Sequence, residues 1–93
     1  MGDERIKGQV PIVNKDKKIV GLINFEIIEE RAIITSLDGV AKDFDSEYIK
    51  ELVWQSLEMY SLLHPDKMEI ANKNRIRSFN INLNKEEKNS KTM

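Results

Sequence analysis

The chain has 93 residues, the length of one domain, and no Cys, which excludes disulfides and thiol nucleophiles and is typical of the reducing cytoplasm. Its 15 basic and 16 acidic residues give a net charge of −1, which argues against a nucleic-acid partner because phosphate binding normally requires a basic excess. No apolar run approaches the roughly 20 residues that cross a bilayer, and residues 1–8 lack the apolar core of a signal peptide, so no membrane partner is expected.

The chain begins with a charged segment, residues 1–8, which we expect to be flexible. A single α+β domain is predicted over residues 9–84, followed by a disordered tail over residues 85–93 because that segment is charged and has little apolar content. Residues 9–13 are typical of a short strand, and Pro11 places it at a sheet edge or at an irregular start because proline cannot donate to a neighbouring strand.

Two longer strands follow, over residues 18–28 and 31–37. The first alternates with a period of two, and its apolar face carries Ile19, Gly21, Ile23, Phe25 and Ile27. In the second, Ala32 and Ile34 alternate with Ile33, Thr35 and Leu37. The tight polar break between the two strands predicts an antiparallel hairpin.

A long helix is predicted over residues 46–63. Asp43, Asp45 and Ser46 offer N-cap oxygens, and His64-Pro65 ends the helix because the residue before a proline is pushed out of helical geometry. The apolar stripe at helical spacing consists of Ile49, Leu52, Val53, Leu57, Tyr60 and Leu63.

The last third of the domain is expected to return to the sheet. Residues 67–71 fit a short strand with Met68 and Ile70 inward, and residues 72–78 fit either a short helix or more strand. Phe79, Ile81 and Leu83 alternate with asparagines and predict a final strand. The fold class is therefore α+β, a mostly antiparallel sheet of about five strands (β-β-β-α-β-(α)-β) with one long helix on one face.

This element order resembles the C-terminal portion of GNAT-type acyl-CoA N-acyltransferases. Residues 37–41 look like the end of the family strand that precedes the pyrophosphate loop, and residues 72–79 look like the later Asn-containing segment, with Phe79 at its aromatic position. The resemblance implies acetyl-CoA or another acyl-CoA as cofactor, bound near Leu37, Gly39, Val40, Asn72 and Phe79. The loop at residues 42–48 has no Gly and carries Asp43, Asp45 and Glu47, which repel a pyrophosphate, so a reduced or degenerate member of the family is implied.

Trp54, the only tryptophan, falls outside the apolar stripe, beside Lys50, Glu58 and other polar residues. It is either an exposed interface anchor or a side chain that folds sideways onto Leu57 and the sheet edge. Lys73, Arg75 and Arg77 form a basic cluster that could hold a phosphate or an RNA strand, but a solvated or salt-bridged surface is favoured, with the acids of residues 43–47 as candidate partners.

Catalytic and metal-binding chemistry finds little support. His64 is the only histidine, and its place at a helix end suits a structural role. With no Cys and no calcium-loop spacing we expect no metal site, and no Ser lies in a nucleophile motif. We therefore expect no catalytic residues.

Two functions remain open. The first is a non-catalytic domain that acts through protein–protein contacts or self-association, through an exposed sheet edge or through Trp54, Lys50, Glu58, Arg75 and Arg77. The second is a reduced acyl-CoA-binding or acyltransferase-like domain.

Overall fold

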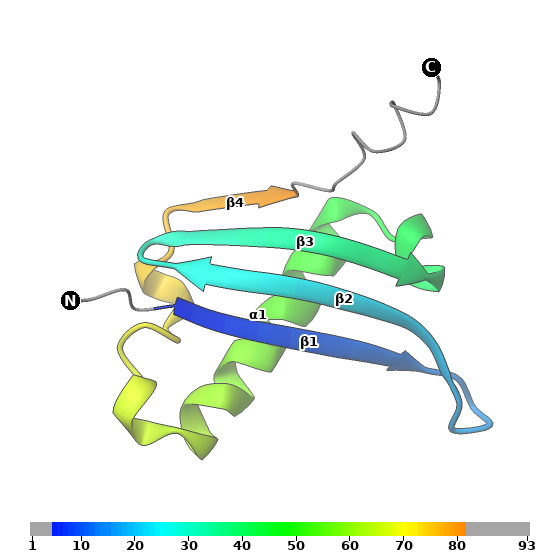
Figure 1. Ribbon diagram of the computed structural model, residues 1–93, viewed down its shortest axis with the longest axis horizontal. Coiled ribbons are helices and arrows are strands. Elements are labelled where there is room, and N and C mark those ends of the chain that lie inside the picture. The colour runs from blue at the N-terminus through cyan, green and yellow to red at the C-terminus, as the bar shows by residue number, and fades with distance from the viewer. Residues whose placement is uncertain (1–4, 82–93) are drawn as a thin grey trace.

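The computed structural model, which describes residues 5–81, consists of a four-stranded mixed sheet with one long helix across one face (Figure 1). The strands follow one another across the sheet in chain order: β1 (Arg5–Val13), β2 (Ile19–Ile28), β3 (Arg31–Gly39) and β4 (Ser78–Ile81). The first three pair antiparallel, and β4 pairs parallel to β3. The α+β class is confirmed, with four strands where about five were predicted.

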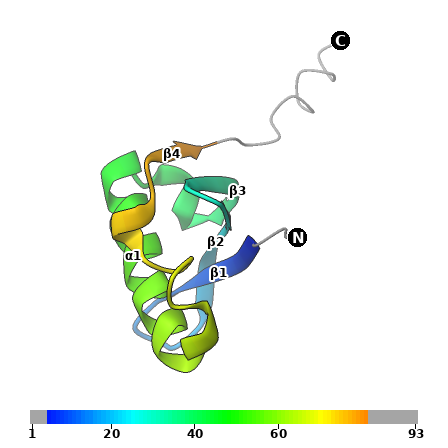
Figure 2. The ribbon, with the colours of Figure 1, turned by 90° about the vertical axis from the view of Figure 1, so that its left-hand side faces the viewer.

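The alternation in β2 sets the core. Ile23, Phe25 and Ile27 are buried on the side that faces the helix, and the residues between them lie half-buried on the open face of the sheet. Figure 2 shows this layering, with the helix on one side of the sheet and no described element on the other. The predicted core face is confirmed for these three residues, whereas Ile19 at the start of the strand is exposed.

The helix α1 (Ser46–Leu63) has the predicted bounds because both of its ends are specified locally. The Asp45 carboxylate accepts a hydrogen bond from the Tyr48 N–H at 2.9 Å, which satisfies one of the free donors of the first turn. Pro65 follows the last helical turn and starts the 3₁₀ helix η2 (Pro65–Lys67). Ile49, Val53 and Leu57 of the apolar stripe are buried against the sheet.

The predicted strand over residues 67–71 is wrong. That segment forms successive turns, in which the Met68 N–H donates to the Pro65 carbonyl and the Ala71 N–H to the Lys67 carbonyl. Ile70 and Ala71 are buried in the core, but Met68 is exposed and not inward as predicted. Alternating apolar residues here therefore reflect a turn packed on the core, since local hydrogen bonds replace pairing with a strand.

Residues 72–78, for which either a short helix or more strand was predicted, contain the 3₁₀ helix η3 (Lys73–Arg75), after which β4 begins. Within the described residues β4 pairs with the first half of β3, from Arg31 opposite Ser78 to Ile34 opposite Ile81. Leu83, which was predicted in the final strand, and the predicted tail at residues 85–93 lie outside the described residues.

A β-bulge in β3 corrects one face assignment. The register between β2 and β3 shifts at Asn24/Phe25, so Thr35 is left without a partner on β2. Beyond it Leu37 pairs with buried Ile23 and packs on the core, instead of sharing a face with Ile33. An extra residue exchanges the two faces of a strand, and the sequence of β3 carries no clear signal for it.

The first strand is longer than predicted. β1 begins at Arg5, so residues 5–8, expected to be flexible, lie in the sheet opposite Ile28 to Phe25. Ile6 is only 1% exposed and anchors this part of the strand in the core. Within residues 5–81 no helix is both long and apolar enough to cross a membrane.

Candidate interaction surface

Within residues 5–81 no strand lies beside the outer edge of β1, since β1 is the first strand of the sheet. The Asn14 N–H donates to the Lys18 carbonyl, on the β2 side, which indicates that even-numbered residues of β1 bond to β2. Odd-numbered residues therefore direct their N–H and C=O groups outward. The position of Pro11 agrees, because a proline within a strand is tolerated where its missing N–H would face solvent.

The C-terminal turns of α1 lie next to this edge. In Figure 1 the helix crosses behind the strands and its last turns emerge beyond β1. Three large apolar side chains are exposed there: Met59 at 58%, Leu62 at 71% and Leu63 at 71%. Leu63 was predicted in the buried stripe. The end of the helix extends beyond the edge of the sheet, however, so nothing in the described part of the chain covers Leu63. We call Lys7, Gly8 and Gln9 of β1 together with Met59, Leu62 and Leu63 of α1 the edge surface.

An open hollow of about 700 Å³ separates the two halves of the edge surface. Its lining includes Gly8 and Phe25 from the sheet and Met59, Tyr60 and Leu63 from the helix. Most of its helix-side lining is apolar, so a strand placed beside β1 would find apolar side chains beneath it, as β1 itself does.

Gly8 has a steric role at this edge. It lies opposite Phe25 in the β1–β2 pair, and the Phe25 ring covers the space that a side chain at position 8 would occupy. The ring is 2% exposed, so it cannot move away easily. A large aromatic surface is thereby brought close to the outer edge of the sheet, which is a known way to compensate for glycine in an edge strand.

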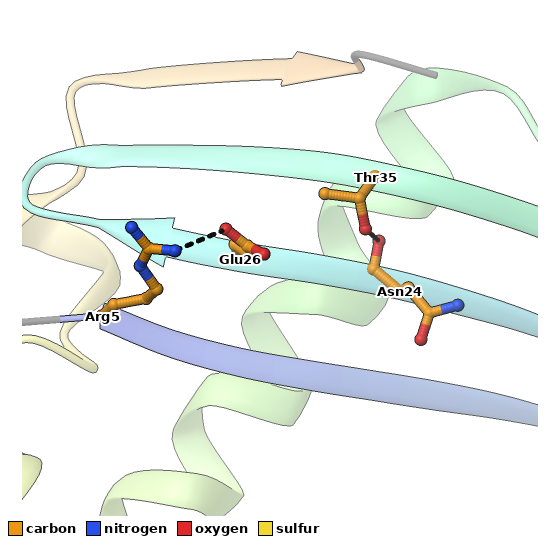
Figure 3. A network of polar contacts seen from close by, with 4 residues as sticks. All are labelled: Arg5, Asn24, Glu26 and Thr35. Carbon is orange, nitrogen blue, oxygen red and sulfur yellow. Dashed lines mark hydrogen bonds and ion pairs between the residues drawn. The ribbon is translucent and has the colours of Figure 1, made fainter. Parts of the chain in front are cut away.

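The open face of the sheet carries a polar network instead (Figure 3). The Arg5 guanidinium lies 3.8 Å from the Glu26 carboxylate, and the Thr35 hydroxyl donates to the Asn24 carbonyl at 3.2 Å. The Asn24 amide also donates to the Ser36 hydroxyl at 2.7 Å. These groups satisfy one another, so the open face offers a weaker site for an apolar contact than the edge surface does.

Trp54 does not stand free. Its ring packs edge-on against Phe79 of β4, with centroids 5.8 Å apart, and the Lys50 ammonium lies 5.8 Å from the centre of the same Phe79 ring. The half-buried Trp54 therefore covers the β4 edge of the sheet, which is the second of the two readings given above. Glu58 lies beside Trp54 in the lining of a separate shallow hollow formed with the segment from Met68 to Asn74.

The basic cluster pairs locally. Arg77 lies 3.5 Å from the Glu30 carboxylate, and Arg75 donates to the Glu69 carbonyl at 3.5 Å. Neither arginine bonds to the acids of residues 43–47, so the predicted partners are wrong. The β2–β3 turn, which holds Glu30, lies next to the start of β4 and supplies the carboxylate instead.

The residues implied by the acyltransferase resemblance are not gathered at one place. Leu37, Gly39 and Val40 lie at the C-terminal end of β3, whereas Phe79 lies opposite Ala32 near its start. Leu37 lies five positions beyond Ala32 along β3, roughly 17 Å of strand. Asn72 precedes η3, where its side chain accepts from the Asn74 N–H.

Other chemistry is limited. His64 stacks on Tyr60 with ring centroids 4.3 Å apart at the end of α1, which suits a structural role. In the described part of the chain no three His, Cys, Asp or Glu side chains converge in a way that could hold a metal ion. From the sequence, the sheet edge was predicted only in general terms, and the exposed apolar end of α1 was not predicted. The adjacent Leu62 and Leu63, shortly before the helix-ending Pro65, were a usable signal.

Comparison with known proteins gives no match: no family model, no curated protein and no solved structure matches this chain.

Proposed function

We propose that this chain is a small non-catalytic domain that acts through protein–protein contacts, and that the edge surface makes them by taking up an extended strand beside β1. The observation that supports this is the outer edge of the nine-residue β1, which has no neighbouring strand within residues 5–81, with exposed apolar side chains of α1 next to it. Strand addition uses both parts, because the edge supplies main-chain hydrogen bonds and the helix supplies an apolar support for the side chains.

The edge also carries features that restrict pairing. Lys7 and Pro11 are residues that sheet proteins place on edges to discourage indiscriminate association. Lys7 resists a second positive charge opposite it, and Pro11 offers no donor to the incoming strand. Only a strand whose register accommodates both is accepted, which gives the contact specificity.

Affinity capture with two matched variants tests this function. Tagged wild type, Leu63→Asp and Ile19→Asp are compared in extract of cells that express the chain. Leu63 and Ile19 are similarly exposed, at 71% and 67%, but Ile19 lies at the first position of β2, away from the edge surface. We expect Leu63→Asp to retain about a tenth or less of the captured protein, including untagged copies of the chain, because a carboxylate is costly to bury. Equal capture by both variants, or no specific capture by wild type, contradicts the proposal.

A reduced acyl-CoA-binding domain remains the second candidate. The β2–β3 hairpin, α1 and β4 support it in part, because the resemblance implies a hairpin, a long helix, a strand, a short helix and a final strand, of which the strand at residues 67–71 does not form. The Asp45 carboxylate at the helix N-terminus weighs against it, since it already occupies the Tyr48 N–H that an anion would use. An amide NMR titration with millimolar acetyl-CoA decides: shifts confined to residues 37–48 and 72–79 support this candidate, and their absence removes it.

A further inference from the structure

We propose that the strand taken up beside β1 is β1 of a second copy of this chain, in an antiparallel register centred on Gln9. This inference rests on the proposed function of the edge surface and names its partner. The product is a two-fold dimer in which the two sheets join into one continuous sheet with both helices on the same side. A two-fold contact uses the same surface on each copy and closes, so the free β1 edge disappears and no open chain of molecules forms.

The backbone selects this register. Odd-numbered residues of β1 direct their N–H and C=O groups outward, so hydrogen-bonded pairs must join odd residues to odd residues. Centring on Gln9 places Lys7 opposite Pro11 and Arg5 opposite Val13, and this register allows about eight bonds between the copies. Moving the centre by one residue in either direction leaves about six, because fewer complete pairs remain within Arg5–Val13.

The charges agree with the backbone. The two basic residues of the edge, Arg5 and Lys7, lie in the first half of β1, and the second half from Val10 to Val13 is uncharged. An antiparallel partner centred on Gln9 sets each basic half against an uncharged half. Centring on Lys7 would instead place two ammonium groups directly opposite each other, which destabilises a strand pair.

This register also brings apolar groups of the two copies together. On the helix side this register places Gly8 opposite Val10 of the second copy, which gives that valine access to the Phe25 ring beside Gly8. The exposed end of α1 projects beyond β1 beside the first half of that strand (Figure 1). Val10 and Ile12 of the second copy, which this register sets beside Gly8 and Ile6 on the helix side, then lie over that end and cover Met59 and Leu63, which are exposed in a single copy.

The remaining segment of the chain has the wrong chemistry for this place. Residues 82–93 contain only two large apolar residues, Leu83 and Met93, among lysines, glutamates and asparagines. A strand over the apolar end of α1 needs apolar residues at every second position, as β1 has with Ile6, Val10 and Ile12. β1 of a second copy meets this requirement, and the C-terminal segment does not.

Disulfide trapping tests the register, and the natural absence of Cys makes each introduced thiol the only one. In the proposed dimer the two Gln9→Cys residues form a hydrogen-bonded pair with Cα atoms roughly 5.5 Å apart, within the range that a disulfide accepts. Lys7→Cys is the matched control on the same exposed edge, because its two copies would lie roughly 14 Å apart. We expect mild oxidation at micromolar concentration to convert most Gln9→Cys, and about a tenth or less of Lys7→Cys, to a covalent dimer on a non-reducing gel.

Light scattering of the wild type separates the possible failures. A wild-type dimer with no preference for Gln9→Cys over Lys7→Cys overturns the register but leaves the edge surface as a contact site. A wild-type monomer at millimolar concentration, combined with Leu63-dependent capture of another protein, overturns the second copy as partner and leaves the proposed function. A monomer with no Leu63-dependent capture removes both.

Discussion

Gly39→Ala is expected to lower the free energy of unfolding by about 2–5 kcal/mol, because it adds both backbone strain and a direct overlap. Gly39 ends β3 with φ 61° and ψ −138°, a conformation that is essentially restricted to glycine. A methyl group there would overlap the Val20 carbonyl oxygen on the neighbouring strand, which is backbone and cannot rotate away.

Urea denaturation followed by tryptophan fluorescence measures this loss. Asp38→Ala is the control, since Asp38 is the exposed preceding residue and its side chain makes no hydrogen bond or ion pair within residues 5–81. We expect the control to change stability by about 0.5 kcal/mol or less. A Gly39→Ala midpoint equal to that of the control would show that the chain leaves β3 in another conformation.

Phe25→Ala is expected to cost about 3–5 kcal/mol, a large part of the stability of a domain of this size. Phe25 is buried at the middle of β2, between Gly8 of β1 and Ile34 of β3. Its removal opens a cavity at the centre of the core and uncovers the glycine at the edge. Because Gly8 has no side chain, neighbouring groups can fill this cavity only in part.

Phe25→Leu separates loss of volume from loss of the aromatic ring. We expect it to cost about 1–1.5 kcal/mol, because it keeps most of the apolar volume. Both variants are measured by thermal and urea unfolding against wild type. A Phe25→Ala loss no greater than that of Phe25→Leu would contradict the central position of this ring in the core.

The parts of the fold that the sequence predicts well are those specified by neighbouring residues. The helix bounds follow from Asp45 at one end and Pro65 at the other, and the core face of β2 follows from strict alternation. Residues 67–71 alternate in the same way, yet Pro65 and its local turns hold them out of the sheet. Alternation there predicted Met68 and Ile70 inward, but Met68 is exposed, because burial and pairing with another strand both depend on contacts distant in sequence.

The edge surface illustrates the same limit. Leu63 continues the helical stripe perfectly, but whether it is buried depends on where the sheet ends beneath the helix. Trp54 lies off the stripe and is nevertheless covered, because β4 brings Phe79 beside it from 25 positions further along the chain. Side-chain periodicity on one element cannot give the width of the sheet that it packs against.

Amide hydrogen exchange of the full chain at two concentrations tests whether the outward N–H groups of β1 bond to a second copy. We expect the Lys7 and Gln9 amides to exchange at least about tenfold more slowly at millimolar than at low micromolar concentration. The Ile6 and Val10 amides, which face β2, should be protected at both. Fast exchange of the Lys7 and Gln9 amides at every concentration would contradict the proposed dimer, because the β1 edge would then remain open to water.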